Sequence, residues 1–188
     1  MSKKINDGSV INHLAIDPHD GIVLCWQQGT KAQWLDNFKQ GLAIPGGKHK
    51  MMLDLTITGP GMFSLKDLFD LSQELDVRIE TKMMFAFHPD IVFSPFAWPR
   101  NVLDRHVDAL LDYMVPKATH KQQTLIKTLQ EMKNRLVFSE QWPDTHNEQF
   151  RNGRHYQKQL DDIRKDVVNI STIYAADPEL LAWWEREI

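Results

Sequence analysis

The sequence contains a single cysteine, Cys25, in 188 residues. One thiol excludes an internal disulfide, and it excludes any cluster or zinc site built from several thiolates of this chain. Cys25 lies in the apolar run 21–26, where no histidine or aspartate stands at a suggestive spacing. A buried structural thiol is therefore favoured over a nucleophile.

Long apolar runs and an excess of one charge are also lacking. No run approaches the length of a membrane span, and residues 1–7 lack the apolar core of a signal peptide. The net charge of -3 gives no general attraction to nucleic acid or to anionic membranes. With 42% hydrophobic residues, the chain can form a globular domain with one ordinary core. Because it lacks these signals and an excess of charge, we expect a cytoplasmic protein with no nucleic-acid or membrane partner.

Three common patterns of catalytic sites are missing. The segment 59–61 lacks the lysine and the further glycines of a phosphate-binding loop, and no G-x-S-x-G motif occurs. The eight histidines are scattered, and no two of them have the i, i+4 spacing of a helical zinc site. Basic residues after position 116 are interleaved with acidic ones, which indicates solvated helical faces. No metal site is predicted within the chain.

The most informative stretch is 51–85. Apolar and polar side chains alternate over 52–58 and again over 77–83, a pattern typical of strands. Between them, Ser64 is a candidate N-cap, and apolar residues recur at helical spacing from Leu65 to Leu75. A strand, a helix and a strand in this order predict a βαβ unit with parallel strands.

The alternation itself has two interpretations, because parallel strands covered on both faces are usually apolar throughout. In a barrel, the polar side chains of both strands would point into a lumen that suits a polar ligand. In an open sheet, the same side chains would be solvated on one wet face. The sequence leaves both interpretations open.

The rest of the chain favours an α/β fold followed by helices. We expect a strand over 10–17, a helix over 32–42, and an ordered apolar loop over 86–99, which contains three prolines. Helices are predicted over 101–114, 120–136 and 154–165. Near the end of the chain, Asp177 is a candidate N-cap with Pro178 at the first helical position.

Four stretches together resemble one family, the radical S-adenosylmethionine proteins with a twitch-type auxiliary domain. The resemblance spans most of the chain, and it depends on the order and spacing of weak motifs. The stretches are Leu14-Ala15-Ile16-Asp17 with residues 26–37, Leu55-Thr56-Ile57-Thr58 with residues 63–68, His88-Pro89 with Ser94-Pro95 and Trp98-Pro99-Arg100, and Arg164 with Asp177-Pro178-Glu179-Leu180.

The resemblance implies that this chain is the C-terminal half of such a protein. Its fold would be half of a partial TIM-type (β/α) barrel over residues 1–100, followed by a helical C-terminal region over 101–188. In the family, a CxxxCxxC motif binds a [4Fe-4S] cluster that cleaves S-adenosylmethionine. That motif and the GGE strand motif are missing here, and Ala15, Gln28 and Gly61 depart from the family pattern. The chain alone is therefore expected to be inactive.

By strand position, the resemblance implies a set of residues that line the S-adenosylmethionine and substrate side. These residues are Asp17, Asp54, Thr56, Thr58, Glu80 and Lys82. A half-barrel would leave a strand edge unpaired, so we expect a partner polypeptide carrying the cluster-bearing half, or self-association through that edge. Two alternatives remain: a non-catalytic α/β module or remnant that binds a peptide or small polar ligand, and a self-contained α/β domain with an accidental resemblance.

Overall fold

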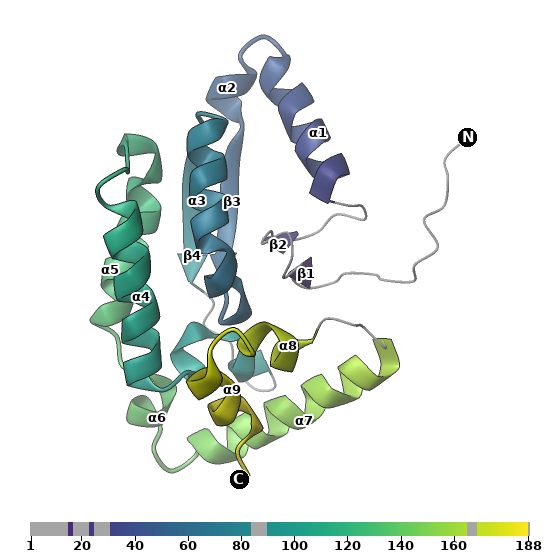
Figure 1. Ribbon diagram of the computed structural model, residues 1–188, viewed down its shortest axis with the longest axis vertical. Coiled ribbons are helices and arrows are strands. Elements are labelled where there is room, and N and C mark those ends of the chain that lie inside the picture. Colours follow the sequence, from purple (N-terminus) through teal and green to yellow (C-terminus); the bar gives the residue numbers. More distant parts are fainter. Residues whose placement is uncertain (1–14, 17–22, 25–30, 84–89, 165–168, 188) are drawn as a thin grey trace.

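The computed structural model describes residues 15–16, 23–24, 31–83, 90–164 and 169–187 (Figure 1). Its strands are β1 (Ala15–Ile16), β2 (Val23–Leu24), β3 (Met52–Ile57) and β4 (Arg78–Met83). Its α-helices are α1 (Lys31–Ala43), α2 (Gly47–Lys50), α3 (Leu65–Glu74), α4 (Arg100–Met114), α5 (Gln123–Lys133), α6 (Phe138–Gln141), α7 (His146–Arg164), α8 (Ile170–Tyr174) and α9 (Pro178–Glu185). Short 3-10 helices are η1 (Pro60–Ser64), η2 (Asp90–Phe93), η3 (Pro95–Ala97) and η4 (His120–Gln122).

The predicted βαβ unit is present. β3 and β4 are parallel, with a register that runs from Met52 opposite Arg78 to Ile57 opposite Met83, and η1 and α3 connect them. β1 and β2 form a separate antiparallel pair. The chain is thus a mixed α/β fold in which helices predominate. Within the described residues the β3–β4 sheet has only two strands.

One face of the β3–β4 sheet forms part of the hydrophobic core. Leu53, Leu55, Ile57 and Ile79 are buried, and they alternate with exposed or half-buried neighbours. Helix α3 lies in front of this sheet and runs along β3 in Figure 1, and its own apolar residues belong to the same core cluster. Each fully buried apolar side chain contributes about 1.5–3 kcal/mol. The alternation of apolar and polar residues in β3 and β4 therefore reflects a sheet with one face covered by the core and one face open to solvent.

The turn between α3 and β4 is fixed by contacts from the following helices. Ser72 Oγ donates to the Val77 carbonyl at 2.7 Å and accepts from Gln122 Nε2 at 2.7 Å. Asp76 has a φ of 56°, which is unusual for a residue with a side chain. Lys121 Nζ donates to the Asp76 carbonyl at 2.7 Å. These bonds hold the start of β4 in place.

The C-terminal helices pack on the sheet unit rather than apart from it. α4 lies against α3 and α5, and α5 lies against β4, where Thr81 Oγ1 and Thr128 Oγ1 are 2.6 Å apart. α8 packs on η1, just beyond the carboxyl end of β3. The predicted helices over 32–42 and 101–114 are confirmed, whereas the helix expected over 154–165 begins earlier, at His146. The division at residue 100 stays a prediction.

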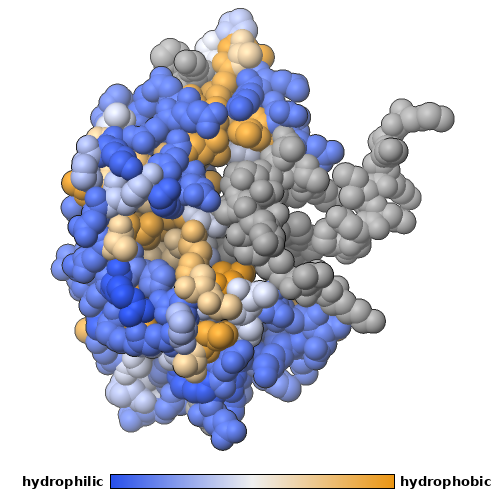
Figure 2. All heavy atoms as spheres, in the orientation of Figure 1, coloured by the Kyte–Doolittle hydropathy of each residue, from blue (hydrophilic) through white to orange (hydrophobic). Residues whose placement is uncertain are grey.

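Hydrophilic side chains cover most of the face shown in Figure 2. Hydrophobic side chains gather in the middle of that face and near the α1–α2 end; Ile44, which follows α1, and Met52, at the start of β3, are among the exposed hydrophobic residues. None of the helices in the described ranges combines the length and the apolar character needed to cross a membrane.

Candidate functional site

The open face of the β3–β4 sheet carries most of the polar residues that the sequence singled out. We call the set Asp54, Thr56, Arg78, Glu80 and Lys82 the sheet face. Their side chains share one side because they alternate with the buried residues of the same two strands. The face therefore arises directly from the strand pattern.

Two carboxylates stand side by side on the sheet face. Asp54 on β3 is the register partner of Glu80 on β4, and like charges directly opposite each other are unfavourable. Each carboxylate has its own cation: Lys82 Nζ lies 2.8 Å from Asp54 Oδ2, and Arg78 Nε lies 3.0 Å from Glu80 Oε1. The two ion pairs offset the repulsion between the carboxylates.

These ion pairs are open to solvent. The Lys82 and Asp54 side chains are 70% and 54% exposed, and those of Arg78 and Glu80 are 57% and 36% exposed. An exposed pair contributes little to stability, about 0–1 kcal/mol, because water competes for both charges. A polar ligand could therefore replace either partner at small cost. Chemically, the face offers two carboxylate acceptors, an ammonium and a guanidinium.

The two predicted threonines differ in position. Thr56 is half-buried within β3, opposite Lys82. Thr58 follows the end of β3, is fully buried, and accepts a hydrogen bond from the Gly61 N–H at 3.0 Å. The structure therefore sets Thr58 apart from the sheet face, because its hydroxyl is used in the turn that begins η1.

Beyond the carboxyl end of β3, a group of aromatic rings encloses Gly59. The Gly59 N–H donates to the Phe93 carbonyl at 2.6 Å. A Cβ at this position would lie 2.9 Å from Trp98 Nε1 and 3.0 Å from the Tyr174 hydroxyl. Trp98 Nε1 in turn donates to that hydroxyl at 3.1 Å, and burial raises the pKa of Tyr174. This end of β3 is covered by Trp98, from the segment between η3 and α4, and by Tyr174 of α8.

A buried carboxylate joins α4 to the start of α9. We call Asp177, Arg105 and His106 the α4–α9 clamp. Asp177 Oδ2 lies 2.6 Å from Arg105 Nη2 and 2.7 Å from His106 Nε2, while its Oδ1 accepts from the N–H groups of Glu179 and Leu180. The predicted N-cap role of Asp177 is confirmed.

The pKa of Asp177 is lowered to about 2 despite its burial. Burial alone would raise it, but the hydrogen bonds from His106, Arg105 and the Leu180 N–H, together with the charge of Arg105, favour the ionised form. The clamp is a fixed ion pair rather than an acid poised to transfer a proton. We assign it a structural role.

The other sequence-based site predictions remain open. Asp17 and Cys25 lie outside the described residues. Within the ranges that the structure covers, no three histidine, cysteine, aspartate or glutamate side chains are grouped so that they could hold a metal ion. Of the six predicted binding residues, the structure brings together Asp54, Thr56, Glu80 and Lys82.

The binding residues implied by the resemblance did not include Arg78, and no sequence pattern indicated the clamp. Arg78 was visible in the same alternation as Glu80 and Lys82. His106 and Asp177, in contrast, are 71 residues apart, and no local pattern relates two residues at such a separation. Only the packing of α9 against α4 brings them together.

Comparisons with protein-family models, curated proteins and solved structures found no match to this chain.

Proposed function

We propose that this chain is the substrate-side half of a divided radical S-adenosylmethionine enzyme, with the cluster held by another polypeptide. The fold proposed for the assembled protein is a partial (β/α) barrel, of which β3, α3 and β4 are one strand–helix–strand unit. The observation that carries the proposal is the sheet face, a set of polar and charged side chains opposite the buried residues that share a core with α3. In a (β/α) barrel the side of the sheet opposite the helices is the interior, so in the proposed assembly these side chains would line the lumen.

The charges of the sheet face suit the methionine part of S-adenosylmethionine, which has an ammonium and a carboxylate. Asp54 and Glu80 can accept hydrogen bonds from an ammonium, and Lys82 can donate to a carboxylate. The cluster, in contrast, does not fit this chain, because Cys25 is its only cysteine. We therefore assign to the chain the binding and orientation of polar groups, and no redox step.

The strand edge supports the need for a partner. Among the described residues, β3 pairs with β4 and with no other strand, while α5 lies against β4. Unpaired N–H and C=O groups along an edge favour the addition of a further strand. A cluster-bearing half would supply that strand and close the wall beside β3.

The first test is to examine the reading frames next to the gene for one that encodes CxxxCxxC and a GGE strand, and to co-express its product with this chain. We expect a stable complex that forms 5′-deoxyadenosine from S-adenosylmethionine under reducing conditions. Glu80→Gln should lower that activity, whereas Glu131→Gln, which removes an exposed carboxylate from α5, should not.

Two results would contradict the proposal. One is a chain that stays monomeric with every such partner. The other is a complex whose activity is the same with Glu80 and with Gln at that position. Complex formation itself serves as the folding control, because a variant that still assembles has kept its surface.

A second function is favoured by the exposure of the two ion pairs on the isolated chain. The sheet face would then bind a small zwitterionic ligand or a peptide without catalysis. Such a ligand should raise the melting temperature (Tm) of the isolated chain, and Asp54→Ala and Lys82→Ala should weaken that effect. Unchanged melting across a panel of amino acids, peptides and S-adenosylmethionine would exclude this function.

A further inference from the structure

Two arginines meet at the C-terminal end of α9, one on α7 and one directly after α9, and neither has a carboxylate partner among the described residues. Arg154, on α7, donates from Nη1 to the carbonyls of Trp184 and Arg186 at 2.7 and 2.6 Å. Arg186 donates from Nη1 to the Trp183 carbonyl at 3.1 Å. These bonds stabilise the carbonyls that end a helix. They use one nitrogen of each guanidinium and leave the other N–H donors available.

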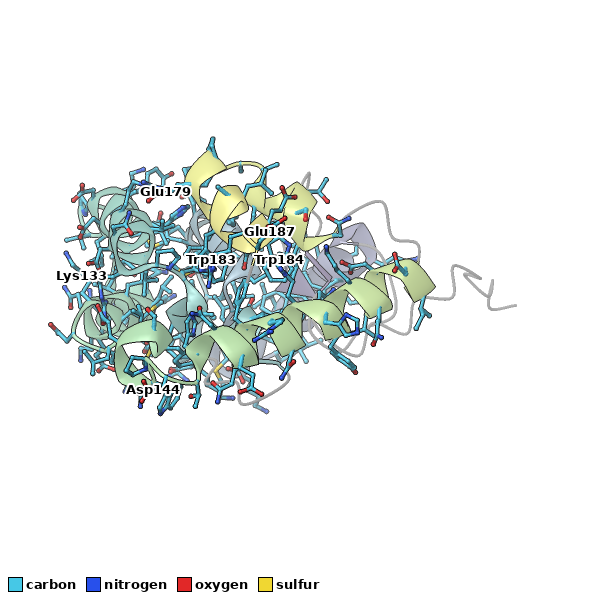
Figure 3. The ribbon with its side chains drawn as sticks, turned by 90° about the horizontal axis from the view of Figure 1, so that it is seen from below. Lys133, Asp144, Glu179, Trp183, Trp184 and Glu187 are labelled. Atoms are coloured by element: carbon cyan, nitrogen blue, oxygen red, sulfur yellow. The ribbon has the colours of Figure 1, made fainter. Side chains whose placement is uncertain are left out.

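The two guanidiniums lie around one aromatic ring. The Cζ atoms of Arg186 and Arg154 are 4.4 and 5.6 Å from the centre of the Phe150 ring, and Arg186 is also 5.2 Å from the ring of Trp183. Figure 3 shows Trp183 and Trp184 between α9 and α7. Two like charges are thus held together at a half-buried position, where they repel each other. Burial and the charge of Arg154 both lower the pKa of Arg186.

A buried histidine adds an unused polar atom to the same face of α7. His146, Phe150 and Arg154 are spaced four residues apart and therefore lie in one row along the helix. His146 is 5% exposed, and its Nδ1 has no hydrogen-bond partner in the described chain. Arg186 is near enough for its charge to lower the pKa of His146, after the larger effect of burial. Buried polar atoms without partners are uncommon in folded proteins.

We propose that Arg154, Arg186 and His146 form a binding site for the phosphate group of a ligand. Guanidinium groups bind phosphate with paired hydrogen bonds. A phosphate monoester carries a charge of about −1.5 to −2 at pH 7 and so balances both arginines, which a single carboxylate does not. The site is independent of the sheet face. Its residues lie on α7 and directly after α9, whereas the sheet face lies on β3 and β4.

The test is to titrate the full chain with phosphate at constant ionic strength and to measure binding by the change in Tm and in tryptophan fluorescence. Trp183 lies beneath Arg186 and should report occupancy. We expect saturable binding of inorganic phosphate, weakened about tenfold or more by Arg186→Gln. Arg151→Gln, which removes an exposed arginine from the same helix, should leave the affinity unchanged. Acetate, as the carboxylate probe, should bind more weakly than phosphate.

Several outcomes would overturn the site. These are a fluorescence response that does not saturate, equal stabilisation of wild type and both variants, and tighter binding of acetate than of phosphate. A lower Tm of Arg186→Gln with unchanged phosphate affinity would show that the arginine only stabilises the end of α9. If Arg186→Gln does not fold, Arg186→Lys keeps the charge but loses the paired hydrogen bonds, and it should still weaken binding.

Discussion

The sheet face and the α4–α9 clamp contain the same kinds of charged group in opposite surroundings. Lys82 and Asp54 form their ion pair largely in water, whereas the side chain of Asp177 is 10% exposed and has four hydrogen-bond partners. A carboxylate in water can exchange partners, and a buried one cannot without a large penalty. The buried carboxylate therefore stabilises the fold, whereas the exposed ion pairs contribute little to stability and can exchange partners, as the proposed recognition by the sheet face requires.

Removal of the Trp98 ring, which lies beside the clamp, should have the largest effect on the free energy of unfolding. Trp98 is fully buried, and it contacts the rings of Phe63, His106 and Tyr174. Trp98→Ala should lower the free energy of unfolding by about 3–5 kcal/mol because it leaves a large cavity. Urea denaturation measures this change. The control is Trp34→Ala, at a half-buried position of α1, where a similar loss would contradict the special role of Trp98.

Loss of the clamp carboxylate should have the second-largest effect on the free energy of unfolding. Asp177→Ala removes the N-cap of α9 and leaves Arg105 and His106 without their shared partner. We expect a loss of about 2–3 kcal/mol in the free energy of unfolding. Asp162→Ala, at an exposed position of α7, should change it by less than about 0.5 kcal/mol. Equal effects of the two substitutions would mean that the clamp adds nothing to stability.

The same carboxylate predicts a pH dependence. The pKa of Asp177 is about 2 in the folded chain, below its ordinary value of 3.8. Its contribution is therefore fully present above the ordinary value and is lost as the pH falls from about 4 to about 2. Stability curves of the wild type and Asp177→Asn should converge over this interval. Parallel curves would show that Asp177 is not the group responsible.

Overpacking at the end of β3 should have a smaller but clear effect. Gly59→Ala would place a methyl group against Trp98 and Tyr174, both of which are buried, and should cost about 1–3 kcal/mol. Gly41→Ala is the control, because its new methyl group meets only the flexible end of Met51 and the helix gains a better helix former. A lower Tm for Gly59→Ala than for Gly41→Ala would support the close packing around Gly59, and the opposite order would contradict it.

The smallest effect is expected on the sheet face. Lys82→Ala should change the free energy of unfolding by less than about 1 kcal/mol, because the ion pair with Asp54 is exposed. A double-mutant cycle with Asp54→Ala isolates the coupling between them. A coupling above 2 kcal/mol would mean that this pair is structural, and the contrast with the clamp would be lost.

Local patterns in the sequence predicted the elements whose signals are local. The alternation over 52–58 and 77–83 and the apolar spacing over 65–75 predicted β3, β4 and α3, and Asp177 with Pro178 predicted the start of α9. The start of α7 was missed because Pro143 interrupts the segment before the helix expected over 154–165, whereas α7 begins at His146, three residues after the proline.

The candidate sites differ in how many of their residues the sequence could predict. Asp54, Thr56, Glu80 and Lys82 were predictable because strand alternation assigns each residue to a face. The position of Thr58 was not, because the chain turns directly after β3 and the hydroxyl bonds to Gly61. The arrangement of Arg154 and Arg186 depends on how α7 and α9 pack, and no short-range pattern encodes that contact.

The hydroxyl of Ser72 has a consequence for how the molecule folds. It joins α3 and the start of β4 to Gln122, which is 50 residues farther along the chain. Contacts at such separations form late, because the intervening loop must first be closed. The βαβ unit therefore depends on residues that leave the ribosome long after β4 does. We expect a nascent chain that ends near residue 100 to expose its apolar sheet surface until α4 and α5 have been synthesised.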